Sequence, residues 1–379
     1  MPGVAFIIPT RDRPHELARA IGVVGRLVGA DRVGGAEVVI ADNGSTPPVS
    51  APAFLGNGTP VRVIRLEANA GAAARNIATS ETDADWLVML DDDSHPTDAG
   101  VFDAIVNAPD DVGAIGAEIF LTNGQREAGG LPEVFVGCGV AIRRSAFVSA
   151  GGYDASFQFY AEEYDLAAKL LLDGWRVTHD RRFRVSHEKS LTQRSMDRIC
   201  RRLVRNNAWV AARYAPRSLR RGAIVRDVAR YARIAMREDA MAGYGRGLAE
   251  MFATVHRQKR SPMSDALWDR FVGLAAVREA FESSAVIRRR PVVCVVERGK
   301  NDWVIDQVIG EFGLSATDDP ARADAVVVGT CSPGPMLDGA ERWTQRGEEQ
   351  GISVIEPWLM GRSGAGSNAS DRTALTLAS

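Results

Sequence analysis

Short runs of apolar residues alternate with amphipathic stretches over the first half of the chain. Runs such as Val4–Ile8 and Trp86–Leu90 are apolar on both faces, which is typical of strands buried inside a parallel sheet. Helical patterns at Pro14–Leu27 and Gly71–Ser80 separate the early strands. The alternation predicts an α/β fold with a mainly parallel sheet. Further strands are expected at Glu37–Ala41, Val61–Leu66, Gly113–Phe120, Gly137–Ile142 and Trp175–His179.

The pattern changes twice in the second half of the chain. From about residue 190 to 285 it predicts amphipathic helices rich in Arg, without a convincing strand. After Pro291, two β-like runs, "VVCVV" and "ADAVVVGT", alternate with helical patterns at Trp303–Phe312 and near Ala340–Gln350, and "ISVIEPW" follows. We therefore expect a larger α/β unit at 1–188, a helical segment at 189–288 and a small α/β unit at 289–362. The Gly- and Ser-rich stretch 363–379 is expected to be disordered.

Composition narrows the class of protein. The 379 residues are 45% hydrophobic and 25% charged, and the formal net charge is −2, which predicts no general attraction to nucleic acid. The four cysteines lie far apart without a CxxC pair, so neither a disulfide framework nor a zinc site is indicated. High Ala, Arg and Gly usage suggests a bacterial source.

Membrane signals are weak. No apolar stretch approaches the ~20 residues that span a bilayer, and the N-terminus enters a strand without a leader pattern. The sequence thus predicts a cytoplasmic protein without a transmembrane segment. Basic amphipathic helices after residue 190 leave peripheral membrane contact open, although a solvated helix packed on the catalytic unit is the other interpretation.

Three adjacent carboxylates follow the run Trp86–Leu90. Asp91, Asp92 and Asp93 lie at the carboxyl end of the expected strand, where open α/β sheets bind ligands. Hard oxygen ligands suit Mg²⁺ or Mn²⁺ carrying a diphosphate, although a solvent-exposed acidic cap is the alternative. Strand alternation predicts that Asp92 faces solvent or supports its neighbours, and Ser94–Pro96 reads as a turn.

Three more loops carry polar residues after early strands. "IIPTRDRP" places Pro9, Thr10 and Arg13 at the end of the first strand. In "VVIADNGS", Asp42 is positioned to accept hydrogen bonds from a base or ribose, but Asp-Asn-Gly-Ser also favours a simple Asx turn. In "NAGAAARN", small residues permit close approach of a ligand, with Arg75 and Asn76 expected to face one pocket; a tightly packed Ala-rich helix is the alternative.

Together these motifs resemble the inverting glycosyltransferases of family two, which have the GT-A fold of nucleotide-diphospho-sugar transferases. The resemblance rests on "IIPTRDR", "ADNGS", "GAAARN", the acidic triplet and the block "GGYDASFQFYAEEYDLAAKLLLDGWRVTHDRRFRVSH" at 151–187. It covers about the first 190 residues, with every motif in order. It implies a mixed, mostly parallel sheet and a sugar-nucleotide donor.

The resemblance also implies roles for individual residues. The donor would be bound by Pro9, Thr10, Arg13, Asp42, Arg75 and Asn76, with Asp91 and Asp92 also near it. The divalent metal, Mn²⁺ or Mg²⁺, would be bound by Asp91, Asp93 and His187, with Asp93 the most direct ligand.

The catalytic base falls in the matched block. Where the family has Glu-Asp, this chain has Glu162 and Glu163, so the resemblance implies Glu163 as the base and Glu162 as the alternate. The longer side chain shifts a carboxylate by about 1.5 Å, a distance that matters for catalysis. "VGCGVAIRRSAF" matches a Gly-rich loop beneath the acceptor, with Gly137 and Cys138 lining the pocket. Asp165 is expected to have a structural role at a helix N-terminus.

The last unit resembles a BRCT domain. The resemblance rests on "ADAVVVGT" and "ISVIEPWL" and on the order of strands and helices across 289–362, and it departs at "FGLSAT". It implies a possible protein partner, and a generic Rossmann-like docking unit is the alternative.

The sequence as a whole favours a metal-dependent inverting glycosyltransferase. It would transfer a sugar from a UDP- or dTDP-type donor to an acceptor hydroxyl or amine by direct displacement. A non-catalytic scaffold whose last unit binds a protein partner is the first alternative. Nucleotidyl transfer is the second, and the lack of a Gly-rich, Lys-bearing loop after the first strand argues against it.

Overall fold

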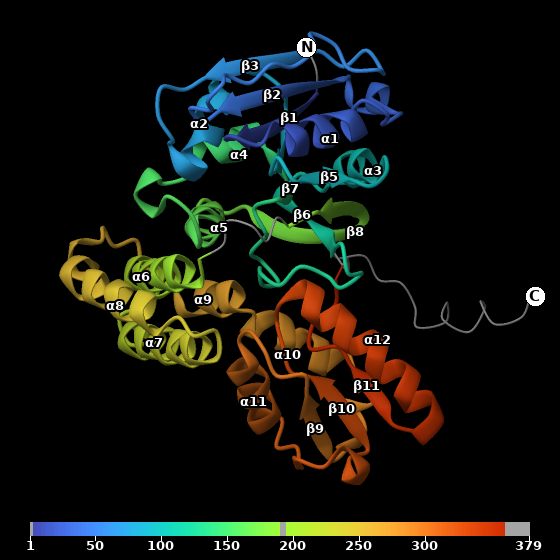
Figure 1. Ribbon diagram of the computed structural model, residues 1–379. Helices are drawn as coiled ribbons and strands as arrows, with labels where there is room; N and C mark the ends of the chain where they lie inside the picture. The colour runs from blue at the N-terminus through green and yellow to red at the C-terminus, as the bar shows by residue number, and fades with distance from the viewer. Residues whose placement is uncertain (1–2, 190–194, 361–379) are drawn as a thin grey trace, which may run out of the picture.

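The computed structural model describes residues 3–189 and 195–360 (Figure 1). These residues form an eight-stranded mixed sheet, a helical segment and a three-stranded parallel sheet. The predicted architecture, a mixed and mostly parallel sheet followed by helices and a small α/β unit, is confirmed. The tail expected to be disordered, 363–379, lies outside the described residues.

The large sheet has the order β3-β2-β1-β4-β7-β6-β8-β5. From β1 the chain first adds strands on one side and then returns to add β4 on the other side, so β1 and β4 flank a topological switch point, where α/β sheets bind ligands. Its strands are β1 (Val4–Thr10), β2 (Ala36–Asp42), β3 (Val61–Arg65), β4 (Trp86–Leu90), β5 (Ser94–Pro96), β6 (Val112–Leu121), β7 (Gly139–Arg143) and β8 (Arg176–His187).

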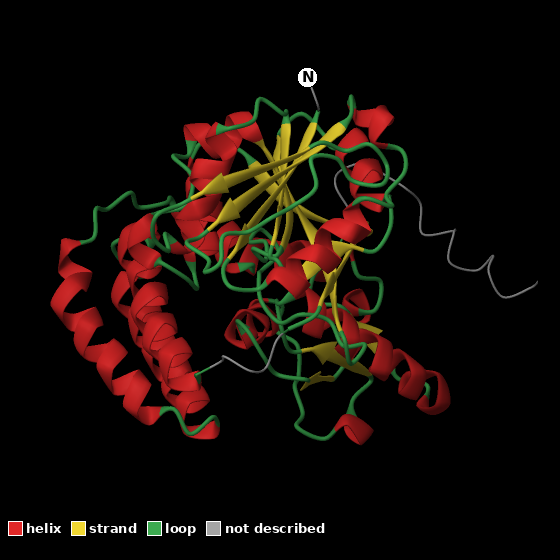
Figure 2. Cartoon of the chain, turned by 45° about the horizontal axis from the view of Figure 1, so that its top comes forward, coloured by secondary structure: helices red, strands yellow, loops and turns green. Residues whose placement is uncertain are grey.

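Helices cover both faces of this sheet (Figure 2). Alternate residues of β1 point to opposite faces: Phe6 and Ile8 pack with α1 (Pro14–Val24) and α3 (Gly100–Val106), while Ala5 and Ile7 join the core on the other face. That second face carries α2 (Ala74–Ser80), α4 (Arg144–Ser149) and α5 (Glu162–Leu172). Burial on both faces explains why the early strands read as continuous apolar runs.

Two sequence expectations about strand ends were wrong. Ser94–Pro96, read as a turn, forms strand β5, and β8 does not end at His179 but runs on to His187. The two segments pair antiparallel, with Ser94 opposite His187. The cross-strand hydrogen bonds satisfy backbone groups that a turn would have left to water. As a result, His187 lies beside the acidic triplet.

The helical segment packs against the sheet through α6. Asp165 of α5 is fully buried and accepts hydrogen bonds from Arg213 Nη1 at 2.8 Å and Tyr214 Oη at 2.6 Å, which agrees with the structural role expected for it. The segment contains α6 (Met196–Tyr214), α7 (Arg220–Arg237), α8 (Met241–Thr254), α9 (Asp265–Val272) and α10 (Leu274–Ser283). None of the helices in the described part of the chain has both the length and the apolar character of a membrane span.

The C-terminal unit has the predicted order of strands and helices. Its elements are β9 (Val293–Val296), α11 (Asp302–Glu311), β10 (Ala325–Val328), α12 (Pro333–Gln350) and β11 (Ser353–Ile355), and the sheet order is β11-β10-β9. The unit lies against the end of the large sheet that carries β6 and β8 (Figure 1). The predicted boundaries and the BRCT resemblance stay predictions.

Candidate active site

The candidate site lies at the switch point of the large sheet. Thr10 and Asp42 end two neighbouring strands and are paired in register. Asp91–Asp93 follow β4, the strand on the other side of β1. Arg13 precedes α1 and reaches the same region. Three segments far apart in the sequence therefore converge at one edge of the sheet.

The acidic triplet is neutralised largely by side chains of the chain itself. Arg13 donates to Asp92 Oδ1 at 2.7 Å and to Asp93 Oδ2 at 2.8 Å. Arg75 forms an ion pair with Asp91 and donates to the Leu90 carbonyl at 3.0 Å. Of the three acids, Asp91 has the most open side chain, with 41% exposed. Each guanidinium group is thus placed where the oxygens of a diphosphate could replace the carboxylate that it now binds.

Asp92 does not face solvent. It is only 3% exposed, and its Oδ2 accepts a hydrogen bond from Thr10 Oγ1 at 2.8 Å. Of the two expectations for Asp92, the solvent-facing side chain is wrong, because the chain leaves the strand conformation after Leu90 and the alternation of strand residues no longer applies. A side chain that supports its neighbours agrees with the bonds from Thr10 and Arg13. Burial raises the pKa of Asp92 to about 7, against the opposing effect of Arg13.

Arg75 and Asn76 make different contacts, and the expectation that they face one pocket stays a prediction. The Asn76 amide donates to the Tyr153 carbonyl at 2.8 Å and accepts from the Tyr153 N–H at 3.0 Å. Adjacent helical residues point about 100° apart, so one side chain reaches the acids while the next ties α2 to the loop before α5.

His187 is the centre of a buried polar cluster. Its Nε2 atom lies 3.3 Å from Asp93 Oδ1, and its Nδ1 atom lies 2.9 Å from Glu127 Oε2 and 3.5 Å from Cys138 Sγ. Burial disfavours the imidazolium, but the bonds to Asp93, Cys138 and Glu127 outweigh it and raise the pKa of His187 to about 12. Burial likewise opposes ionisation of Asp93, yet the bonds from His187 and Arg13 hold the pKa of that carboxyl well below its usual range.

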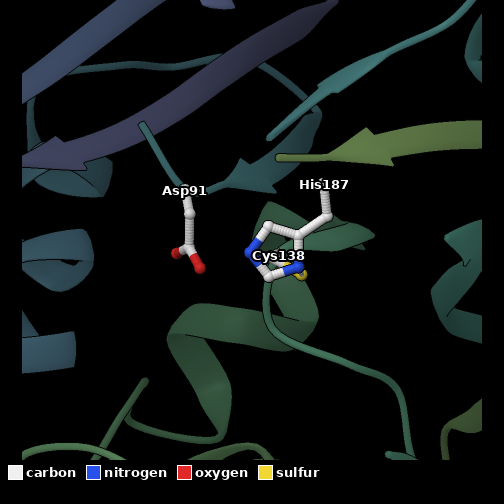
Figure 3. A group of neighbouring side chains, drawn as sticks. All are labelled: Asp91, Cys138 and His187. Carbon is white, nitrogen blue, oxygen red and sulfur yellow. Dashed lines mark hydrogen bonds between the residues drawn. The ribbon is translucent and has the colours of Figure 1, made fainter. Parts of the chain in front are cut away.

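The donor set suits a divalent cation. Ligand atoms of Asp91, Cys138 and His187 all lie within 4.8 Å of one another, and Figure 3 shows the Asp91 carboxylate and the His187 ring around one space with Cys138 beside the ring. Burial raises the pKa of the Cys138 thiol, and a sulfur donor suits Mn²⁺ or Mg²⁺ less well than an oxygen donor does. The remaining donors, Asp91, Asp93 and His187, are oxygen and imidazole groups that suit Mn²⁺.

Asp42 adopts the conformation of an Asx turn. Its Oδ1 accepts from the Ser45 N–H at 2.8 Å, and its Oδ2 accepts from the Val49 N–H at 3.0 Å and pairs with Arg65. Burial opposes ionisation, but these bonds outweigh it and lower the pKa of Asp42 to about 2. The hydrogen bonds of Asp42 within the protein therefore agree with a role in the turn. Contact with a nucleoside stays a prediction.

The two candidate bases, Glu162 and Glu163, open α5 but have different surroundings. Burial, together with its neighbour's charge, raises the pKa of Glu162, whose other charged neighbours are Arg75 and Asp91 on the metal side. Burial also raises the pKa of Glu163, whose cationic neighbour is Lys300 of the C-terminal unit. The Glu162 Oε2 atom is buried and has no hydrogen-bond partner among the described residues.

The loop before α5 is fixed by one buried amide. Asn206 of α6 is fully buried, and its Nδ2 atom donates to the carbonyls of Phe157, Phe159 and Tyr160 at 2.7 to 3.2 Å. The backbone of Tyr160 and Ala161 has positive φ, a conformation that costs energy for residues with a Cβ. The bonds from α6 thus support a strained turn that aims the two glutamates.

A cavity of about 990 Å³ lies between the three parts of the chain. Glu163 and Tyr164 line it from α5, and Lys300 and Trp303 line it from the C-terminal unit. Lys300 Nζ contacts the Tyr164 hydroxyl, and burial lowers the pKa of Lys300 to about 8 against the effect of Glu163. Gly137 and Cys138 do not line this cavity, and a Cβ on Gly137 would meet nothing within 4 Å, so this glycine meets no steric requirement of the protein itself.

Sequence reasoning missed Glu127 and Lys300. Neither residue lies in a matched motif, and both act through contacts with residues 60 or more positions away, His187 and Glu163. Cys138 was expected to line the acceptor pocket, but it lies 3.5 Å from His187 Nδ1 and does not line the cavity described above. Local pattern carried no signal for these contacts, which depend on how β8 pairs and where the last unit packs.

Comparison with known proteins supports part of this interpretation. The chain is 26% identical over 232 residues to the O-antigen biosynthesis protein RfbC of Myxococcus xanthus, covering 51% of this chain and 18% of that protein. It is 26% identical over 209 residues to a pre-mycofactocin glycosyltransferase of Mycobacterium tuberculosis, covering 49% of this chain and 42% of that protein. The chain thus spans less than half the length of these two relatives.

One solved structure with a similar fold is the mannosyltransferase PcManGT from Pyrobaculum calidifontis in complex with GDP-Man and Mn²⁺. The TM-score is 0.44 at 16% identity, covering 76% of this chain and 82% of that chain. A family model described as glycosyl transferase family 2 matches residues 5–111, which include β1, β4 and the acidic triplet. The match of these residues agrees with the resemblance to family-two glycosyltransferases that the sequence motifs indicate.

Proposed function

We propose that the protein is a metal-dependent inverting glycosyltransferase that uses a nucleoside-diphosphate sugar, of UDP or dTDP type, as donor. The observation that carries the proposal is that His187 lies within 4.8 Å of ligand atoms of Asp91 and Cys138 and 3.3 Å from Asp93, at the switch point between β1 and β4. Carboxylates and an imidazole that gives up its Nε2 proton on metal binding are a donor set for Mn²⁺ or Mg²⁺. A scaffold without chemistry would not need buried charges whose desolvation costs several kcal/mol.

The leaving diphosphate would be bound by residues that now pair with one another. Arg13 and Arg75 hold their guanidinium groups on the acidic triplet, and phosphate oxygens are equally good acceptors for them. The metal, bound by Asp91, Asp93 and His187, would stabilise the negative charge that develops on the nucleoside diphosphate as the sugar bond breaks. Thr10 fixes Asp92 beside Arg13, which keeps the guanidinium in place.

The acceptor would enter the cavity in which Glu163 lies. A base must be within hydrogen-bond reach of the hydroxyl or amine that it deprotonates, and Glu163 is the candidate that lines a space large enough for a substrate. Burial raises the pKa of Glu163 from its ordinary value toward neutral pH, a direction that suits a general base. Glu162, which faces Arg75 and Asp91, remains the alternate. Direct displacement from this side inverts the anomeric centre.

The names of the relatives do not fix the acceptor of this chain. One relative takes part in O-antigen biosynthesis and another is named for pre-mycofactocin. A protein partner for the C-terminal unit and a cytoplasmic location stay predictions. We expect no nucleic-acid partner, because the net charge is −2.

The proposal is tested by incubating the full chain with a panel of sugar nucleotides and Mn²⁺ and measuring release of nucleoside diphosphate. Release that requires Mn²⁺ and is lost in Asp93→Asn supports the proposal. Release of pyrophosphate would indicate nucleotidyl transfer. If no sugar nucleotide binds and none is cleaved, the scaffold alternative holds and the proposal fails.

A further inference from the structure

The loop between β6 and β7, residues 122–138, contacts both the candidate metal site and the C-terminal unit. It leaves β6 at Leu121 and enters β7 at Gly139. Two adjacent residues in it face in different directions: Glu127 contacts His187, and Arg126 contacts α12. This loop is therefore a direct physical connection between the last unit and the site.

On the site side, Glu127 is placed to orient the imidazole. Its side chain is 8% exposed, and its Oε2 lies 2.9 Å from His187 Nδ1 while Lys189 pairs with its other oxygen. With Nδ1–H donating to Glu127, Nε2 is the ring nitrogen on the side of Asp93, and it would bind a cation there after losing its proton. A carboxylate behind a ligating histidine fixes the tautomer and ring orientation and raises the basicity of the ligand.

On the side away from His187, the loop is bound to the C-terminal unit through Arg126. The guanidinium is 8% exposed and donates to Asp338 Oδ1 at 2.7 Å and to both oxygens of Glu341 at 2.7 and 2.9 Å, and Glu118 of β6 accepts from Nε at 2.7 Å. The Arg126 N–H also donates to Asp338 Oδ2 at 3.0 Å. Arg126, Glu118 and Asp338 are largely buried while Glu341 is 57% exposed, so removing Asp338 would leave part of the buried charge of Arg126 unpaired.

Backbone contacts at the start of α12 strengthen this attachment. Ser332 Oγ accepts from the Gly129 N–H at 3.0 Å and donates to the Gly129 carbonyl at 2.6 Å. A Cβ added to Gly334 would lie 2.3 Å from the Glu127 carbonyl, so only glycine lets the helix approach the loop so closely. The two elements are therefore packed backbone to backbone at the residue that contacts His187.

We propose that Glu127 is a positioning residue for the metal ligand His187, and that the C-terminal unit acts on the metal site by fixing the Glu127 loop through Arg126. The inference rests on the proposed function, because it needs His187 to bind the metal. It assigns the last unit a role inside the enzyme, in addition to any partner that the unit binds. The ligand class is a divalent cation, with Mn²⁺ as the probe.

The first test compares two glutamates of the same loop. Glu127→Gln keeps the size of the side chain but removes the charge behind His187, and we expect Mn²⁺ affinity, measured by calorimetry on the full chain, to fall about 10- to 100-fold. Glu133→Gln is the matched control, because Glu133 pairs with Arg270 at 2.6 and 2.7 Å and does not contact His187. Its Mn²⁺ affinity should stay within about twofold of that of the unchanged chain.

The second test changes residues of the C-terminal unit that contact the loop. In Asp338→Asn/Glu341→Gln we expect Mn²⁺ affinity to fall about 2- to 30-fold, a typical range for energetic coupling through a packed network. Arg278→Met is the control, because it removes an ion pair with Glu311 that joins α10 to α11 without contacting the loop. Binding of UDP in EDTA should be unchanged in all four variants, which excludes general loss of structure.

The results separate this inference from the proposed function. If the unchanged chain binds Mn²⁺ and releases nucleoside diphosphate but Glu127→Gln binds the metal equally well, the inference fails alone. Equal losses in the variants and their controls would also overturn it, since they would reflect stability. If His187→Ala binds Mn²⁺ as tightly as the unchanged chain, both the inference and the proposed metal site fail.

Discussion

Ser94 and His187 face each other in the antiparallel ladder between β5 and β8, 93 positions apart in the sequence. This one pair brings an imidazole to the three carboxylates that follow β4. The register leaves little freedom, because a slip by one residue would turn the His187 side chain to the other face of the sheet. The proposed metal site therefore depends on strand pairing as much as on its ligands.

Replacing His187 should abolish metal-dependent turnover. We expect His187→Ala to lower Mn²⁺-dependent release of nucleoside diphosphate by at least about 100-fold, because the cation loses a ligand and Asp93 loses its partner. His95→Ala is a suitable control, because His95 lies in β5 and faces Glu188 at 3.6 Å instead of the acids. Similar losses in the two variants would argue against a ligand role for His187.

Glutamine substitutions should decide which carboxylate of α5 is the base. We expect Glu163→Gln to lower kcat by about 10²- to 10⁴-fold with little change in the affinity for the donor, because the acceptor proton would have no receiver. Glu162→Gln should have the smaller effect on kcat. Glu297→Gln serves as control, because Glu297 lines the same cavity from the C-terminal unit and is paired with Arg342 at 3.0 Å. A larger kcat loss in Glu162→Gln would reverse the assignment.

Asp42 should make the free energy of unfolding depend on pH in the acidic range. Its pKa is lower in the folded chain, about 2 against 3.8, so its contribution is complete above pH 4 and is lost as the pH falls through about 2. The difference corresponds to about 2 kcal/mol in the free energy of unfolding. Asp42→Asn should therefore be less stable by about that amount at pH 7 and should lose the matching pH dependence. Urea unfolding at several pH values measures both.

The same variant tests the two interpretations of Asp42. If the residue only closes an Asx turn, Asp42→Asn will bind UDP with nearly unchanged affinity at a temperature where it is folded. A loss of UDP affinity that exceeds the loss of stability would show that the carboxylate contacts the nucleoside, as the family resemblance implies.

Asn206 should be costly to remove. Asn206→Ala removes the side-chain donor shared by three carbonyls before α5, of which that of Phe157 keeps the Phe159 N–H, and we expect a loss of about 2–3 kcal/mol in the free energy of unfolding. Because the loop carries the strained residues before Glu162, kcat should fall as well. The neighbouring Asn207→Ala removes one bond within α6 and should cost less than about 1.5 kcal/mol. Equal costs in urea unfolding would contradict the special role of Asn206.

The sequence predicted what local pattern encodes. Trp86–Leu90 was recognisable as a strand because burial on both faces leaves a continuous apolar run, and β4 has those bounds. The order of elements in the C-terminal unit followed from the same signal. By contrast, Ser94–Pro96 has the composition of a turn and becomes a strand only because β8 supplies its partner. Pairing over 90 residues overrides a three-residue preference.

The sequence motifs predicted the main residues of the site but not the residues that surround and position them. Asp93 and His187 were brought together as expected, yet the buried position of Asp92 could not be read from strand alternation, because the chain turns at Leu90. Glu127 and Lys300 lie outside every motif. Their proximity to the site follows from how the β6–β7 loop and the C-terminal unit pack, and no period or spacing in the chain records that.

The joint between the β6–β7 loop and α12 has a consequence for engineering. A chain shortened before residue 289 would lose Asp338 and Glu341 and leave Arg126 with Glu118 as its remaining hydrogen-bonded carboxylate. It would also open one wall of the cavity beside Glu163. Grafting a foreign last unit onto this enzyme would therefore alter substrate choice and cofactor affinity in one step, and transplants should carry the loop and the helix as a matched pair.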